Sequence, residues 1–123
     1  MRVDTRDAPD IVLFAIDWRA RALIRAQLIE DGFDVLATDT WREARRWLRH
    51  SSTPRAVIVD VTDVKHPMDL LEGLRELTRP DRVIVLTGLG ALPPAPIEGL
   101  GFRVLKRPFA IGDVSAAVRG ALS

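Results

Sequence analysis

Three short apolar runs, rich in β-branched residues, constrain the fold of this chain more than any other feature. They read IVLFAI at 11–16, AVIVDV at 56–61 and RVIVLT at 82–87. Their hydrophobicity is continuous rather than alternating, which is typical of strands buried on both faces, as in a parallel sheet. Two weaker runs, FDVLAT at 33–38 and FRVL at 102–105, would complete a sheet of five strands.

Segments with the apolar spacing of helices separate these runs. Each carries an apolar stripe opposite polar residues, at about 18–31, 40–50, 68–78 and 111–122. The fourth connection, GLGALPPAPIEGLG at 88–101, holds four glycines and three prolines. Any helix in it is therefore expected to be short or irregular, around 96–100. Strand and helix alternate along the chain, and right-handed crossovers then predict an α/β fold with a doubly wound parallel sheet.

Composition limits the classes of protein to which the chain can belong. Its 123 residues are 47% hydrophobic and 28% charged, which fits one globular domain; we place it at 10–123, after a flexible N-terminal extension at 1–9. The net charge of +1 argues against binding to nucleic acid through this domain. The chain has no cysteine, no signal peptide and no apolar run of about 20 residues, so we expect a cytoplasmic protein with no membrane contact.

Polar residues stand where the predicted strands end. Asp17 follows the first strand, Asp60 ends the third, Thr87 ends the fourth, and Lys106 and Arg107 follow the fifth. In an open parallel sheet the binding crevice lies at these carboxyl ends. A carboxylate, a hydroxyl and a cation at one rim can hold a phosphoryl group on an aspartate. The sequence therefore predicts a crevice of this kind.

The chain resembles the receiver domain of two-component response regulators, relatives of the chemotaxis response regulator, over about residues 10–122. The similarity lies in IVLFAIDWRARALIRAQLIEDGFDV, AVIVDV, MDLLEGLREL, RVIVLTG and VLKRPF, in this order and spacing. It implies a flavodoxin-like sheet in the order 2-1-3-4-5. It also implies a phosphorelay signalling domain that is not an enzyme, with a histidine kinase or an output domain or protein as partner. Family members often pair, which leaves a homodimer open.

The resemblance assigns roles to the strand-end residues. Asp60 corresponds to the aspartate that accepts the phosphoryl group, and Thr87 to the hydroxyl residue that contacts it. Arg107, directly before the PF pair, corresponds to the lysine of the family. Lys106 stands one place earlier, and neighbours on a strand point to opposite faces, so only one of the two cations can reach the crevice. We favour Arg107.

The chain departs from the family at the metal site. Where the family has two acids that hold Mg²⁺, this chain has Ala15 and Ile16. Mg²⁺ takes oxygen ligands, and each carboxylate at about 4 Å is worth on the order of 4 kcal/mol before desolvation. We therefore expect no metal and no other cofactor. Asp17 is a weak candidate ligand, because an aspartate before WRARALI is more typical of a helix N-cap.

Three functional hypotheses follow. The first, which we favour, is a degenerate receiver, or pseudo-receiver, that acts through protein–protein interaction without Mg²⁺-dependent phosphorylation. The second is a working receiver that is phosphorylated on Asp60 with an altered Mg²⁺ site that includes Asp17. The third is a flavodoxin-like binder of a small ligand in the same crevice, for which the chain has no glycine-rich phosphate loop.

Overall fold

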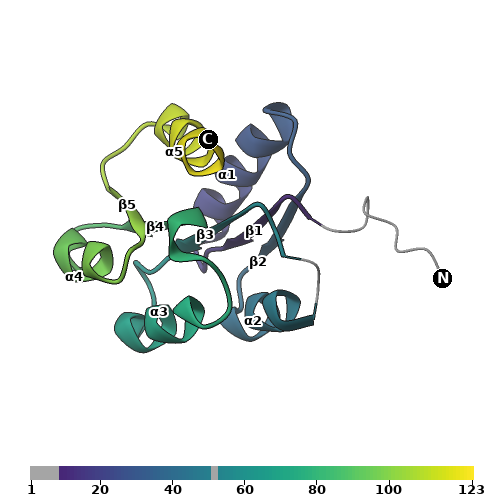
Figure 1. Ribbon diagram of the computed structural model, residues 1–123. Helices are drawn as coiled ribbons and strands as arrows, with labels where there is room; N and C mark the ends of the chain where they lie inside the picture. The colour runs from purple at the N-terminus through teal and green to yellow at the C-terminus, as the bar shows by residue number, and fades with distance from the viewer. Residues whose placement is uncertain (1–8, 51–52) are drawn as a thin grey trace.

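The computed structural model describes residues 9–50 and 53–123. Within these residues, five parallel strands form one sheet in the order β2-β1-β3-β4-β5, with helices on both faces (Figure 1). This is the predicted flavodoxin-like, doubly wound arrangement. Residues 1–8 of the predicted N-terminal extension lie outside the described residues. The elements follow one another as β1 (Ile11–Phe14), α1 (Trp18–Glu30), β2 (Val35–Thr38), α2 (Trp41–His50), β3 (Ala56–Asp60), α3 (Pro67–Arg75), the 3₁₀ helix η2 (Pro80–Arg82), β4 (Val83–Thr87), α4 (Pro94–Gly99), β5 (Arg103–Lys106) and α5 (Ile111–Leu122).

Successive strand residues bury their side chains in two separate cores, one on each face of the sheet. On one face, alternate residues such as Val57 and Val59 pack with buried residues of α2, α3 and α4. On the other face, the intervening residues, such as Ile58, pack with α1 and α5. Figure 1 shows α1 and α5 together on one side of the sheet and α2 and α3 on the other. This double burial explains why the strand sequences are continuously apolar.

Helices α1 and α5 are also joined by a polar contact. The Ser115 hydroxyl donates a 2.6 Å hydrogen bond to the carboxylate of Asp31, the residue that follows α1. This hydrogen bond is the main cause that lowers the pKa of Asp31 below its ordinary value. Gly32 then adopts φ 98°, a conformation that suits glycine and ends the helix at the predicted place.

Three elements are two or more residues shorter than the sequence predicts, and one of them is β2, which starts at Val35 instead of residue 33. β1 ends at Phe14 instead of residue 16, because the chain leaves the sheet to place Asp17 in the extended conformation of a helix N-cap. α3 ends at Arg75 instead of residue 78. The chain there tightens into a turn in which Leu77 donates to the Leu74 carbonyl at 3.0 Å.

The proline-rich connection forms the short helix that its composition predicts. α4 covers only six residues, Pro94–Gly99, and follows Pro93. Proline is tolerated at a helix start because the first N–H groups of a helix have no partner within it. Ile97 is fully buried and anchors this short helix to the sheet. No helix in the described part of the chain is long and apolar enough to cross a membrane.

Candidate functional site

The carboxyl ends of β3, β4 and β5 bring the predicted site residues to one edge of the sheet. Asp60 ends β3 and pairs in register with Leu86 of β4. Thr87 ends β4 and pairs with Lys106 of β5. The backbone N–H of Arg107 then donates to the Thr87 carbonyl at 2.8 Å. The backbone of Arg107 therefore lies beside the end of β4, and β4 separates it from Asp60 at the end of β3.

Asp60 and Arg107 form a two-point ion pair. Arg107 Nη2 donates to Asp60 Oδ2 at 2.7 Å, and Nη1 donates to Oδ1 at 3.4 Å. The Asp60 side chain is 6% exposed and that of Arg107 is 31% exposed. A carboxylate so far removed from water needs a counter-charge and hydrogen bonds. Arg107 supplies both through the planar fork of its guanidinium group.

The alternation of side chains decides between the two cations that the sequence leaves open. Leu105 packs with the core under α1 and α5, on the face of the sheet that Ile58 and therefore Asp60 also share. Arg107 follows Leu105 by two residues and lies on that face too. Lys106 is exposed, and the structure brings Arg107 to Asp60 in its place.

Thr62 belongs to the same cluster, although the sequence reasoning did not identify it. Its backbone N–H donates to Asp60 Oδ1 at 3.0 Å, and its hydroxyl oxygen accepts from Arg107 Nη1 at 3.0 Å. An aspartate commonly accepts from the backbone N–H two residues later in a turn. The Asp-x-Thr spacing was therefore a usable signal.

The Thr87 hydroxyl does not take part in the hydrogen bonds that join Asp60, Thr62 and Arg107. Thr87 is fully buried, and its hydroxyl donates a 2.6 Å hydrogen bond to the carbonyl of Leu92, in the loop before α4. The proton of this hydroxyl is thus directed to the β4–α4 loop rather than to Asp60. A phosphoryl contact by Thr87 stays a prediction.

The end of β1 presents no carboxylate at the two positions where the family carries acids. Ala15 is fully buried and Ile16 is 44% exposed. Their carbonyl oxygens accept hydrogen bonds from Arg21 Nη1, at 2.8 and 3.2 Å. Within residues 9–50 and 53–123, no group of three or more His, Cys, Asp or Glu residues is placed to hold a metal ion. Two backbone carbonyl oxygens that already accept hydrogen bonds from Arg21 do not provide the octahedral set of oxygen ligands that Mg²⁺ takes.

Asp17 acts as the N-cap of α1. Its side chain accepts from the backbone N–H of Arg19 at 3.1 Å, and its backbone is extended, with φ −66° and ψ 118°. This is the arrangement by which an aspartate satisfies an N–H group that has no partner within the helix.

We predict that Asp17→Ala lowers the free energy of unfolding by about 1 kcal/mol, the usual effect of losing a side-chain cap. The loss should be the same with and without Mg²⁺, as measured by urea unfolding. Asp39→Ala is the matched control, because it removes one exposed carboxylate that accepts no hydrogen bond from the described residues. A loss that appears only with Mg²⁺ would instead assign Asp17 to a metal site.

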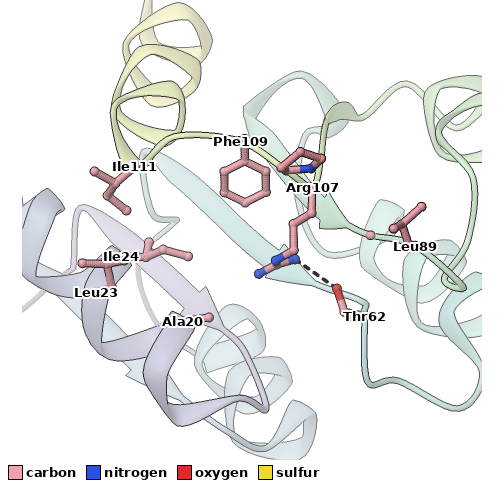
Figure 2. A pocket seen from close by; sticks show the side chains of 10 residues that line it. Ala20, Leu23, Ile24, Thr62, Leu89, Arg107, Phe109 and Ile111 are labelled. Carbon is pink, nitrogen blue, oxygen red and sulfur yellow. Dashed lines mark hydrogen bonds between the residues drawn. The ribbon is translucent and has the colours of Figure 1, made fainter.

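An apolar groove opens beside the ion pair, between α1 and the segment that joins β5 to α5 (Figure 2). Its volume is about 690 Å³. Arg107 and Thr62 lie at its edge, whereas the rest of its lining is mainly apolar and includes Ala20, Leu23, Ile24, Leu89, Phe109 and Ile111. The site therefore combines a buried ion pair with an adjoining apolar surface.

The chain is similar to known proteins at the level of structure. No family model and no curated protein matches the chain. A response regulator receiver domain protein from Clostridium thermocellum is 28% identical, with a TM-score of 0.76, over 91% of this chain and 92% of that one. A response regulator receiver protein from Sinorhizobium medicae WSM419 is 22% identical, with a TM-score of 0.78, over 95% and 96%. A structure named as adenylate cyclase from Rhodopirellula baltica is 24% identical, with a TM-score of 0.75, over 91% and 85%.

The Sinorhizobium and Rhodopirellula structures, both under 25% identical, show that the fold is shared and no more. The Clostridium protein is 28% identical over 91% of this chain. The sheet order is the one that the receiver resemblance implies. An aspartate and an arginine also meet at the carboxyl ends of β3 and β5. The chain therefore has the fold of the receiver domains of response regulators, the signalling modules of two-component systems, and its structural neighbours include such domains.

Proposed function

We propose that this domain is a pseudo-receiver, which keeps the receiver fold as a binding module and acts through protein–protein interaction without Mg²⁺-dependent phosphorylation. Its partner would be a histidine kinase or an output domain or protein of a signalling pathway in the cytoplasm. The domain itself would perform no catalysis. The observation that carries the proposal is the ion pair between Asp60 and Arg107, at 2.7 Å, in a crevice without the two metal-binding acids.

The electrostatics of the crevice support this proposal. Phosphorylation would bring an anionic phosphate to a carboxylate that is already held by Arg107 and by the backbone N–H of Thr62. A metal ion normally offsets that repulsion between anions. Here the family positions for the metal-binding acids carry Ala15 and Ile16, so the arginine alone would have to balance both charges.

Exposed apolar side chains at the same edge support an interaction role. Trp18 is 63% exposed, Leu23 is 60% exposed and Leu89 is 86% exposed. Leu23 and Leu89 both line the groove beside the ion pair, and exposed apolar side chains around a groove are typical of surfaces that bind partners. The partner would then bind at the end of the sheet that carries the ion pair between Asp60 and Arg107.

The test is to incubate the protein with acetyl phosphate and Mg²⁺ and to measure the mass of the intact chain. We expect no phosphate adduct, while a receiver with both metal-binding acids, treated in parallel, should acquire one. A stoichiometric adduct that disappears in Asp60→Asn would refute the proposal. It would support the second hypothesis, a working receiver with an altered metal site that includes Asp17.

A further inference from the structure

The groove beside the ion pair has the size and lining of a site for a small molecule. Its volume of about 690 Å³ falls within the roughly 300–1,000 Å³ typical of ligand pockets. Such pockets are mainly apolar, with a few polar groups that fix the orientation of the ligand. Here the apolar walls come from α1 and from the segment between β5 and α5, and Figure 2 shows the Arg107 guanidinium extending toward α1.

Arg107 has hydrogen-bonding capacity beyond its ion pair. A guanidinium group carries five N–H donors. Nη1 donates to Asp60 Oδ1 and to the Thr62 hydroxyl, and Nη2 donates to Asp60 Oδ2, so three of the five donors are engaged. The Nε–H group and the second N–H of Nη2 have no acceptor among the residues that the structure describes. These two donors lie on one edge of the guanidinium plane, where they match the two oxygens of a carboxylate.

The apolar part of the groove begins next to this cation. The Phe109 ring lies 5.1 Å from the Arg107 guanidinium carbon. Leu23 and Leu89, on the two sides of the groove, keep 60% and 86% of their surfaces exposed. Covering such side chains is favourable in proportion to the apolar area removed from water. A ligand that contacts both parts of the groove must therefore be apolar at one end and anionic at the other.

We propose that the groove binds a small free carboxylate with an apolar body. The carboxylate accepts from Nε and Nη2 of Arg107, and the body lies against Leu23, Ile24, Phe109 and Ile111. Asp60 keeps its own hydrogen bonds, so binding requires neither phosphorylation nor metal. The inference is thus independent of whether Asp60 accepts a phosphoryl group.

A matched pair of probes tests the proposal: 4-phenylbutanoate and its uncharged analogue 4-phenylbutan-1-ol. Each is titrated into the full chain and followed by ¹H–¹⁵N NMR at fixed ionic strength. We expect the carboxylate to bind about tenfold more tightly or better, from its charge-assisted hydrogen bonds. The largest shifts should fall on the backbone N–H groups of Leu23, Ile24, Phe109 and Ile111.

Variants of α1 distinguish binding in the groove from nonspecific binding to exposed apolar side chains. Leu23→Gln should weaken binding of 4-phenylbutanoate about fivefold, since it removes apolar contact. Ile29→Gln is the matched control, because Ile29 is a 44% exposed apolar residue of the same helix and lies outside the lining of the groove; it should leave the affinity unchanged. Arg107→Lys keeps a cation for Asp60 but loses the two-donor edge, so it should reduce the preference for the carboxylate.

Three results would overturn the proposal. They are equal affinity for the two probes, equal effects of Leu23→Gln and Ile29→Gln, and no saturable shift with either probe. Because none of these measurements involves phosphate transfer, they can fail while the pseudo-receiver proposal stands, and the reverse also holds.

Discussion

Arg107→Met is expected to lower the free energy of unfolding by about 2–3 kcal/mol, which is less than the loss for a fully buried pair because Arg107 is 31% exposed. The substitution keeps an unbranched apolar stem beside Gly88, where Cδ of Arg107 lies 3.5 Å from the place that a Cβ at this position would occupy. It removes the positive charge, so the buried carboxylate of Asp60 keeps only the backbone N–H of Thr62 as a donor. Urea unfolding followed by circular dichroism measures the loss.

A double-mutant cycle isolates the charge of Asp60 as the cause. Asp60→Asn should cost only about 1 kcal/mol, because Arg107 can turn its exposed end to water. In that background Arg107→Met should also cost only about 1 kcal/mol, since no buried charge is left unpaired. Equal effects of Arg107→Met with Asp60 and with Asn at position 60 would show that the ion pair contributes nothing specific.

The double substitution Ala15→Asp with Ile16→Asp is expected to make the stability of the domain depend on Mg²⁺. The register that pairs Phe14 with Val59 places position 15 beside Asp60 on the next strand, about 4.8 Å away. Without metal, the added carboxylates should repel Asp60 and lower the free energy of unfolding. Mg²⁺ at 100 times its dissociation constant should then return about 2.7 kcal/mol. The measurement is thermal unfolding across a series of Mg²⁺ concentrations.

The control is Ala15→Asn with Ile16→Asn, which has nearly the same shape without the charges. Its stability, like that of the unmodified protein, should not respond to Mg²⁺. If the aspartate variant also fails to respond, then the two missing acids are not what distinguishes this crevice from a metal-binding one. If the unmodified protein responds, a metal site exists that involves other residues.

The sequence predicted the architecture well because its strongest signals concern burial. Runs such as AVIVDV are apolar on both faces, and only a covered parallel sheet accommodates them. The short α4 was also predictable, because proline limits a helix by local sterics alone. The ends of β1 and α3 were less accurate, since a cap at Asp17 and a turn near Leu77 depend on how the chain packs.

The candidate site was predictable where it follows strand ends and not where it depends on orientation. The meeting of Asp60 with Arg107 follows from alternation along β5. The hydrogen bond of Thr87 to Leu92 and the groove beside α1 depend on loop conformation. Strand patterns carry no information about loop conformation, so these features emerge only from the folded chain.

The hydrogen bond between Thr87 and Leu92 limits how strongly the crevice can influence the β4–α4 loop. A hydroxyl has one proton to donate, and at 2.6 Å that proton is committed to the Leu92 carbonyl. A ligand or partner that attracts it therefore exchanges one hydrogen bond for another. Since a hydrogen bond is worth about 0.5–1.5 kcal/mol net, the exchange can change the ratio of two loop conformations by roughly two- to tenfold. Through this residue the domain would transmit a graded bias rather than an all-or-none transition.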